Sequence, residues 1–266
     1  MIIPIMLTLW ISFHKWSMFT PFGEMEFVGL DNYARATSST HLRAFQNTAI
    51  YVGLSMVITI PLAVLISFLL YFPKLHGRGL VRVLLFTTYV VPMAAIAIIW
   101  SALYAPNYGP LDSLLATFGI DSPGWLSRPS AALVSLVILN VWQMLGYYVV
   151  LLVSGLTQIP EETFEAAKLD GAGPIRQAIS ITLPLLRESL VFVGLMTFIN
   201  SIQVFDPIYM LTQGGPANST NVISFDIQRT AFQNGLAGEA SAMAFSLFIL
   251  IVAVGATLGL TTRRRK

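Results

Sequence analysis

Amide, hydroxyl and carboxylate side chains recur at helical spacing within two otherwise apolar segments of the chain. Inside a membrane such side chains are costly unless they face a cavity or another helix. Amides and a carboxylate can bind hydroxyl groups, and the rings of Trp142 and Tyr148 beside them can cover the apolar faces of a pyranose. The pattern indicates either a sugar path through the membrane or polar contacts that hold neighbouring helices together. The six side chains are Asn140, Gln143 and Tyr147 in the first segment and Asn200, Gln203 and Asp206 in the second.

Asp206 has two interpretations of its own. If the helix continues through Phe205 and Pro207, Asp206 is a carboxylate well inside a membrane span, where ionisable groups are usually functional. If the helix ends at this point, Asp206 is a solvated helix cap.

No catalytic set or metal site is expected. The chain has no cysteine, and its histidines, His14, His41 and His76, fall in predicted loops on different sides of the membrane, where we expect them at the surface. No Gly-Lys dipeptide occurs, so the Walker A phosphate loop is missing. We therefore expect no enzyme activity and no bound cofactor or metal. ATP and magnesium would be used by a partner.

The composition identifies an integral membrane protein. Hydrophobic residues make up 55% of the chain and charged residues only 11%, against about 25% charged residues in a soluble domain. The net charge of +2 is spread along the chain rather than gathered in one patch, so we expect contact with membrane lipid and not with nucleic acid.

Six apolar segments predict an all-α protein with six transmembrane helices, forming one membrane domain over residues 1–266. The first segment reaches only about 20 Å as a helix against a hydrocarbon core of roughly 30 Å, so either the chain is truncated at its N-terminus or the segment is tilted. Pro61 predicts a kink rather than a break in the second segment, and Pro92 lies near the middle of the third. The predicted spans are residues 1–13, 48–71, 83–104, 131–156, 189–211 and 240–260.

Basic residues give the orientation. One side of the membrane holds ten Lys and Arg residues, in the loop at 74–82, the region around 168–187 and the tail at 263–266, and the other side holds five. Because the richer side is the cytoplasm, both termini are predicted to be cytoplasmic, in a bacterial or archaeal inner membrane.

The loop from Pro160 to Pro184 lies between the fourth and fifth spans and is too charged to enter the membrane. Pro160 can begin a short helix that ends near Leu169, Asp170-Gly171-Ala172-Gly173 signals a turn, and Pro174 can begin a second helix. This predicts a cytoplasmic helix-turn-helix elbow (residues 160–184). Its small residues would allow another protein to approach the backbone closely, although an ordinary loop has the same outline.

The residue types of the elbow resemble the EAA loop of ABC importer permeases. Residues 204–220, VFDPIYMLTQGGPANST, resemble a stretch typical of carbohydrate-uptake permeases, with one glycine fewer than some members, and FVGLDNYARA is similar to a pattern of the same group. The resemblance implies a second homologous permease subunit, two cytoplasmic ATPase subunits and an extracytoplasmic substrate-binding protein. By resemblance, the residues that couple to the ATPase are Glu165, Ala166, Ala167, Asp170, Gly171, Ala172, Ile181, Leu183 and Pro184.

The substrate stays open at this stage. Permeases for glycerol-3-phosphate or a glycerophosphodiester share the pattern, although no Lys or Arg in mid-span is available to bind a phosphate monoester. A secondary transporter is the alternative from another class, but neither repeated halves nor a carboxylate cluster is found.

Overall fold

The computed structural model describes residues 2–71 and 77–263, with side chains described as far as residue 257. Some of the predictions fall outside the described residues. They concern Met1 of the predicted first span, Lys74 and residues 264–266 of the basic-residue count, and His76 of the histidines expected at the surface.

The described chain is almost entirely helical, as predicted. A two-residue antiparallel hairpin pairs β1 (His14–Lys15) with β2 (Glu26–Phe27) after the first helix, and a 3₁₀ turn covers Phe22–Glu24. Short π-helical stretches cover Ala178–Thr182 and Arg229–Gln233. The α-helices are α1 (Ile2–Ser12), α2 (Asp31–Ala36), α3 (Ser39–Tyr71), α4 (Arg78–Val90), α5 (Met93–Leu103), α6 (Pro110–Thr117), α7 (Pro129–Leu156), α8 (Glu161–Leu169), α9 (Pro174–Gln177), α10 (Leu183–Leu185), α11 (Arg187–Ile202), α12 (Asp206–Leu211), α13 (Ile223–Gln228) and α14 (Ala237–Arg263).

Four stretches of the described chain are long and apolar enough to cross a membrane: α3, α7, α11 with α12, and α14. A fifth is obtained if α4 and α5 are counted as one broken span. The apolar helix α1 has only 11 residues. The structure therefore supports four to five of the six predicted spans by length and composition.

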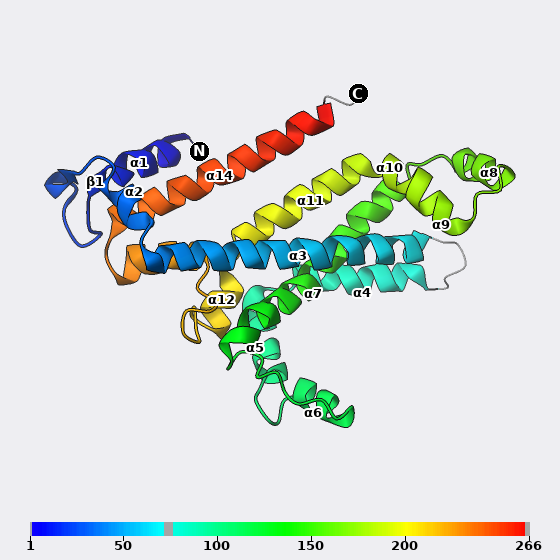
Figure 1. Ribbon diagram of the computed structural model, residues 1–266, viewed down its shortest axis with the longest axis horizontal. Coiled ribbons are helices and arrows are strands. Elements are labelled where there is room, and N and C mark those ends of the chain that lie inside the picture. Colours follow the sequence, from blue (N-terminus) through cyan, green and yellow to red (C-terminus); the bar gives the residue numbers. More distant parts are fainter. Residues whose placement is uncertain (1, 72–76, 264–266) are drawn as a thin grey trace.

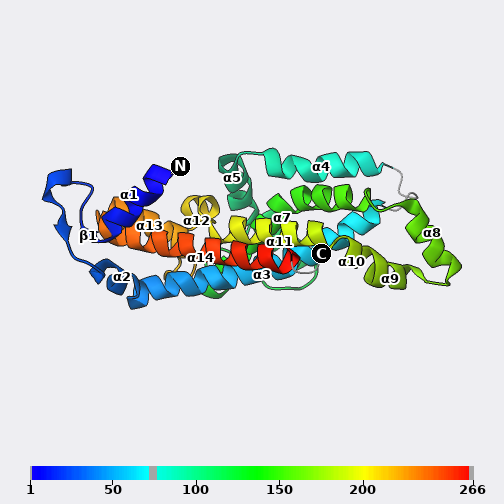
Figure 2. The ribbon, with the colours of Figure 1, turned by 90° about the horizontal axis from the view of Figure 1, so that it is seen from above.

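The predicted third span, residues 83–104, is broken near its middle. Its two halves, α4 and α5, meet at 101° around Val91 and Pro92, and Figure 2 shows α5 turned out of the line of α4. Val91 is extended, with φ −68° and ψ 131°, because the proline ring disfavours helical backbone at the preceding residue. Pro61, by contrast, lies inside α3 without ending it.

The ends of the helices separate two sides of the molecule (Figure 1). The elbow helices α8 and α9 lie at one end, to which the C-terminal ends of α3, α7 and α14 also point, while α2 and α13 lie at the other end and α6 projects beyond α5. The elbow and the end of α14 thus lie toward the same side, as the distribution of basic residues predicts.

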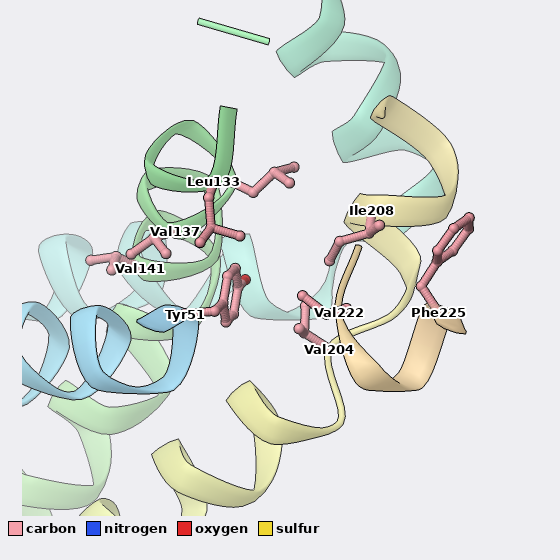
Figure 3. Close-up of a cluster of buried hydrophobic side chains, with 9 residues drawn as sticks. Tyr51, Leu133, Val137, Val141, Val204, Ile208, Val222 and Phe225 are labelled. Carbon is pink, nitrogen blue, oxygen red and sulfur yellow. The ribbon is translucent and has the colours of Figure 1, made fainter. Parts of the chain in front are cut away.

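The helices that carry the polar residues pack around α7. α3 and α4 run along it, and α11 packs against α3. A core cluster joins α3 and α7 to α12 and α13 through buried side chains that include Tyr51, Val137, Ile208 and Val222 (Figure 3). The segment that follows the break after α11 is therefore anchored to the main bundle by apolar contacts.

Candidate functional site

Two amides on one face of α7 are buried without a partner. Asn140 is 7% exposed and Gln143 is 9% exposed, and neither side chain has a hydrogen bond to any other residue that the structure describes. Their amide atoms are not among the fully buried polar atoms that lack a partner, so the amides keep some access to solvent. Within the described residues these two amides are therefore candidates for groups that bind a polar solute.

Aromatic rings surround the same stretch of α7. Tyr147 stacks on Tyr89 of α4, with ring centroids 4.6 Å apart and an interplanar angle of 15°. Trp142 meets Trp100 of α5 edge to face at 5.5 Å. These ring pairs lie along the same stretch of α7 as the two amides. Trp142 was named from the sequence, whereas the contributions of Tyr89 and Trp100 require knowledge of how α4 and α5 pack.

The contacts between aromatic rings continue toward the segment of residues 107–126, which carries α6 and is called the arm below. Trp100 contacts Tyr104, and Tyr104 contacts Trp125, with ring centroids 5.0 Å apart in each pair. The indole of Trp125 donates a 2.6 Å hydrogen bond to Asp112 of α6, whose other oxygen accepts one from the backbone of Asn107. A hydrogen bond from Ser122, ahead of those from Asn107 and Trp125, holds the pKa of Asp112 below its ordinary range.

The polar residues of the second segment, Asn200, Gln203 and Asp206, do not form one site with those of the first. Asn200 donates its hydrogen bond to the hydroxyl of Tyr148 rather than to the amides of α7. Gln203 is exposed at the C-cap of α11, and Asp206 is exposed as the first residue of α12. Of the two interpretations of Asp206, the helix end is the one observed. The backbone break at residues 203–205 moves these two side chains off the α11 helix.

The elbow has the predicted outline. α8 ends at Leu169, Gly171 takes the positive φ of +74°, and α9 begins at Pro174. The amide of Ala172 donates to the carbonyl oxygen of Ala167 at 2.9 Å, which closes the end of α8 in the manner typical of glycine-terminated helices.

One of the small residues expected at a docking surface faces inward instead. Ala167 is only 6% exposed because α8 turns that face toward its own chain, so it is not available to a partner. The outer surface of the elbow exposes Leu169, Ile175 and Ile179 at 89%, 77% and 61%. Of the remaining predicted coupling residues, Glu165, Ala166, Asp170, Gly171 and Pro184 are exposed, and Ala172, Ile181 and Leu183 are half-buried.

Behind the elbow lies a cavity of about 150 Å³, between α8, α9 and the ends of α3 and α7. Phe68 and Tyr71 of α3 line it together with Phe164 of α8, and the rings of Tyr71 and Phe164 are 6.1 Å apart. The elbow therefore contacts the spans through aromatic side chains on its membrane side, opposite the exposed surface.

A group of buried ionisable residues gave no recognisable pattern in the sequence. His41, expected at the surface, is 8% exposed, and it contacts two carboxylates from distant parts of the chain, Asp226 and Glu239. Asp226 also pairs with Arg229 at 2.8 Å. Among the described residues no set of three side chains is arranged to hold a metal ion, since the two carboxylates lie at different nitrogens of the imidazole.

Comparison with known proteins decides the family. Residues 36–265 match the family described as "Binding-protein-dependent transport system inner membrane component". The chain belongs to this family. The resemblance to ABC importer permeases, drawn from the elbow and from residues 204–220, is thereby confirmed, and the secondary transporter is set aside.

Two relatives show how far the likeness to this family of inner-membrane permeases extends. The chain is 35% identical over 253 residues to the trehalose/maltose transport system permease protein MalF of Thermococcus litoralis, covering 94% of this chain and 84% of the relative. It is 33% identical over 261 residues to the diacetylchitobiose uptake system permease protein NgcF of Streptomyces coelicolor, covering 93% and 73%.

The fold is shared with a solved member of the class. A chain in the crystal structure of a bacterial ABC transporter involved in the import of the acidic polysaccharide alginate superposes with a TM-score of 0.84 at 20% identity, covering 98% of this chain and 89% of that one.

Proposed function

We propose that the chain is the membrane-spanning permease subunit of an ATP-driven importer for a sugar or a short saccharide. The observation that carries the substrate class is the pair of buried, unpartnered amides of Asn140 and Gln143 beside the stacked rings of Tyr89 and Tyr147. Amides bind hydroxyl groups and rings cover the apolar faces of a pyranose. The names of the relatives, which refer to trehalose, maltose and diacetylchitobiose, support the same substrate class.

In this proposal the exposed outer surface of the elbow docks on an ATPase subunit. Exposed apolar side chains clustered with charges mark interaction sites in soluble surroundings, and Leu169, Ile175 and Ile179 form such a cluster around the turn at Gly171. The complete transporter would also contain a second permease subunit, two ATPase subunits that bind ATP and magnesium, and an external binding protein. Both termini of this chain would lie in the cytoplasm.

Glycerol-3-phosphate is not favoured as the substrate. A buried phosphate dianion would need Lys or Arg partners, and among the described residues of α7 and α11 the only basic side chain is Arg187, at the elbow end of α11. The nearest polar groups to the proposed path are neutral amides and phenols.

A transport screen tests the substrate class. The complex is reconstituted in liposomes with its cognate external binding protein, and ATP-dependent accumulation is measured for labelled disaccharides and for glycerol-3-phosphate. We expect accumulation of a saccharide that glycerol-3-phosphate does not compete away. Accumulation of glycerol-3-phosphate with no saccharide transported would overturn the proposed substrate class.

A further inference from the structure

The three residues of the buried acidic group come from three separate elements. His41 is in the first turn of α3, Asp226 is in α13 and Glu239 is in the first turn of α14. The ring of His41 reaches across 185 positions of the chain to Asp226 and 198 positions to Glu239. The contacts therefore join the starts of two membrane helices to the short helix between them, at the end of the molecule opposite the elbow (Figure 1).

Polar groups surround both carboxylate oxygens of Asp226. One carboxylate oxygen accepts hydrogen bonds from Arg229 at 2.8 Å and from Asn221 at 3.2 Å, and the other oxygen faces Nδ1 of His41. A carboxylate with donors on both oxygens is favoured in its charged form. Nδ1 of His41 must then carry a proton and donate it to Asp226.

The second ring nitrogen also faces a carboxylate. Nε2 of His41 lies 2.7 Å from Oε1 of Glu239. A neutral imidazole protonated at Nδ1 has only a lone pair at Nε2, which would face the negative oxygen. A proton on Nε2 converts this contact into a charge-assisted hydrogen bond.

The charges balance when that proton is present. The side chains of His41, Asp226 and Glu239 are 11%, 0% and 10% exposed, and that of Arg229 is 23% exposed. Two carboxylates and one guanidinium leave one negative charge, which the imidazolium neutralises. Among the described residues, Asp226 and Glu239 are the ionisable side chains that contact the ring, and Arg229 acts on it through Asp226. Burial of an uncompensated carboxylate is costly.

We propose that His41 is a positioning residue that is held as an imidazolium, and that this proton clamps α13 and the start of α14 to the start of α3. At high pH the proton is lost, Glu239 is left buried beside a neutral ring, and the clamp opens. Transport at alkaline external pH would then fall because the outer ends of the two spans separate. This last consequence rests on the proposed function, but the protonation state and its effect on stability do not.

Nuclear magnetic resonance of the ¹⁵N-labelled imidazole tests the protonation directly. The full chain is placed in lipid nanodiscs, with His14→Gln and His76→Gln introduced so that His41 alone is observed. At neutral pH we expect both nitrogens of His41 to carry protons. A spectrum with a proton on Nδ1 alone would overturn the proposal, whether or not the chain transports a sugar.

Thermal unfolding against pH tests the clamp. The melting temperature of the wild type should fall by about 2–4 °C or more as pH rises from about 6 to about 9, because the imidazolium loses its proton. Glu239→Gln should remove this fall, since the new amide can donate to Nε2 of a neutral ring. His14→Gln is the matched control, because His14 contacts the backbone of Trp10 and no carboxylate, and it should keep the wild-type fall. Equal pH dependence in the wild type and in Glu239→Gln would contradict the clamp.

Discussion

The side-chain amide of Asn200 donates a hydrogen bond of 3.0 Å to the hydroxyl of Tyr148, joining α11 to α7. Tyr148 is 1% exposed and belongs to the cluster formed by α3, α7 and α11. This contact gives Asn200 the helix-bonding role that was one of the two interpretations of the polar residues. It also separates Asn200 in function from Asn140 and Gln143, which have no such partner in the described chain.

Removing either partner of this contact should cost stability rather than substrate affinity. Asn200→Ala and Tyr148→Phe should each lower the free energy of unfolding by about 0.5–1.5 kcal/mol, and the double variant should lose less than the sum. The measurement is denaturation of the purified chain in detergent. Additive losses would show that the two side chains do not interact.

Substitution of the α7 amides should impair uptake without weakening assembly. Asn140→Ala and Gln143→Ala each remove a hydrogen bond worth about 1–3 kcal/mol, which is roughly 5- to 150-fold in apparent affinity. Concentration-dependent uptake measures the effect. Ile138→Ala is the matched control, because Ile138 lies on the same helix but is 40% exposed. Wild-type uptake in both amide variants would show that these residues do not bind the substrate and serve only in packing between helices.

The backbone of α4 comes very near to α7 at Gly146. A Cβ added to this glycine would lie 1.9 Å from the carbonyl oxygen of Leu85, so Gly146→Ala must push the helices apart. We expect a loss of about 1–3 kcal/mol or more in the free energy of unfolding, measured by denaturation. Gly53→Ala in α3 is the control, since nothing lies within 4 Å of the added atom. Equal stability of the two variants would contradict the observed packing.

The arm that carries α6 should depend on the charge of Asp112. Its lowered pKa means that the carboxylate contributes stability at neutral pH, and this contribution is lost only as the pH falls below the ordinary range of an aspartate. The arm should therefore be insensitive to pH between about 5 and 8. Asp112→Asn should increase hydrogen exchange of residues 107–126 at neutral pH, whereas Asp121→Asn should not. Unchanged exchange in Asp112→Asn would show that the carboxylate does not hold the arm.

The turn of the elbow should reject any side chain at Gly171. Its φ of +74° strains every L-residue, although an added Cβ meets nothing within 4 Å, so Gly171→Ala should cost about 1–2 kcal/mol locally. Gly173→Ala is the control, because Gly173 has an ordinary φ of −67° and equally open surroundings. Limited proteolysis of the elbow compares the two. Equal cleavage rates would mean that the turn tolerates a side chain.

Local signals explain which features the sequence could predict. Pro160, Gly171 and Pro174 act on neighbouring backbone, so the two short helices and the turn of the elbow were foreseen. Pro92 lies near the middle of the predicted third span, but the 101° bend there depends on how α5 packs beyond it. The partners of His41 lie 185 and 198 positions away, and no local pattern connects them. Ala167 was misplaced because the inner and outer faces of α8 differ only through contacts with α3 and α7.

The central claim is that this chain couples an ATPase to sugar import through its elbow. The most direct measurement is ATP hydrolysis and sugar uptake by the reconstituted complex, with wild type, Gly171→Asp and Glu165→Lys compared and Glu162→Lys as a charge-matched control on α8. In the wild type and the control, we expect the saccharide-loaded binding protein to stimulate both ATP hydrolysis and uptake. In both elbow variants we expect loss of uptake and weaker co-purification of the ATPase, although the chain still inserts in the membrane. Wild-type docking and uptake in both elbow variants would contradict this claim.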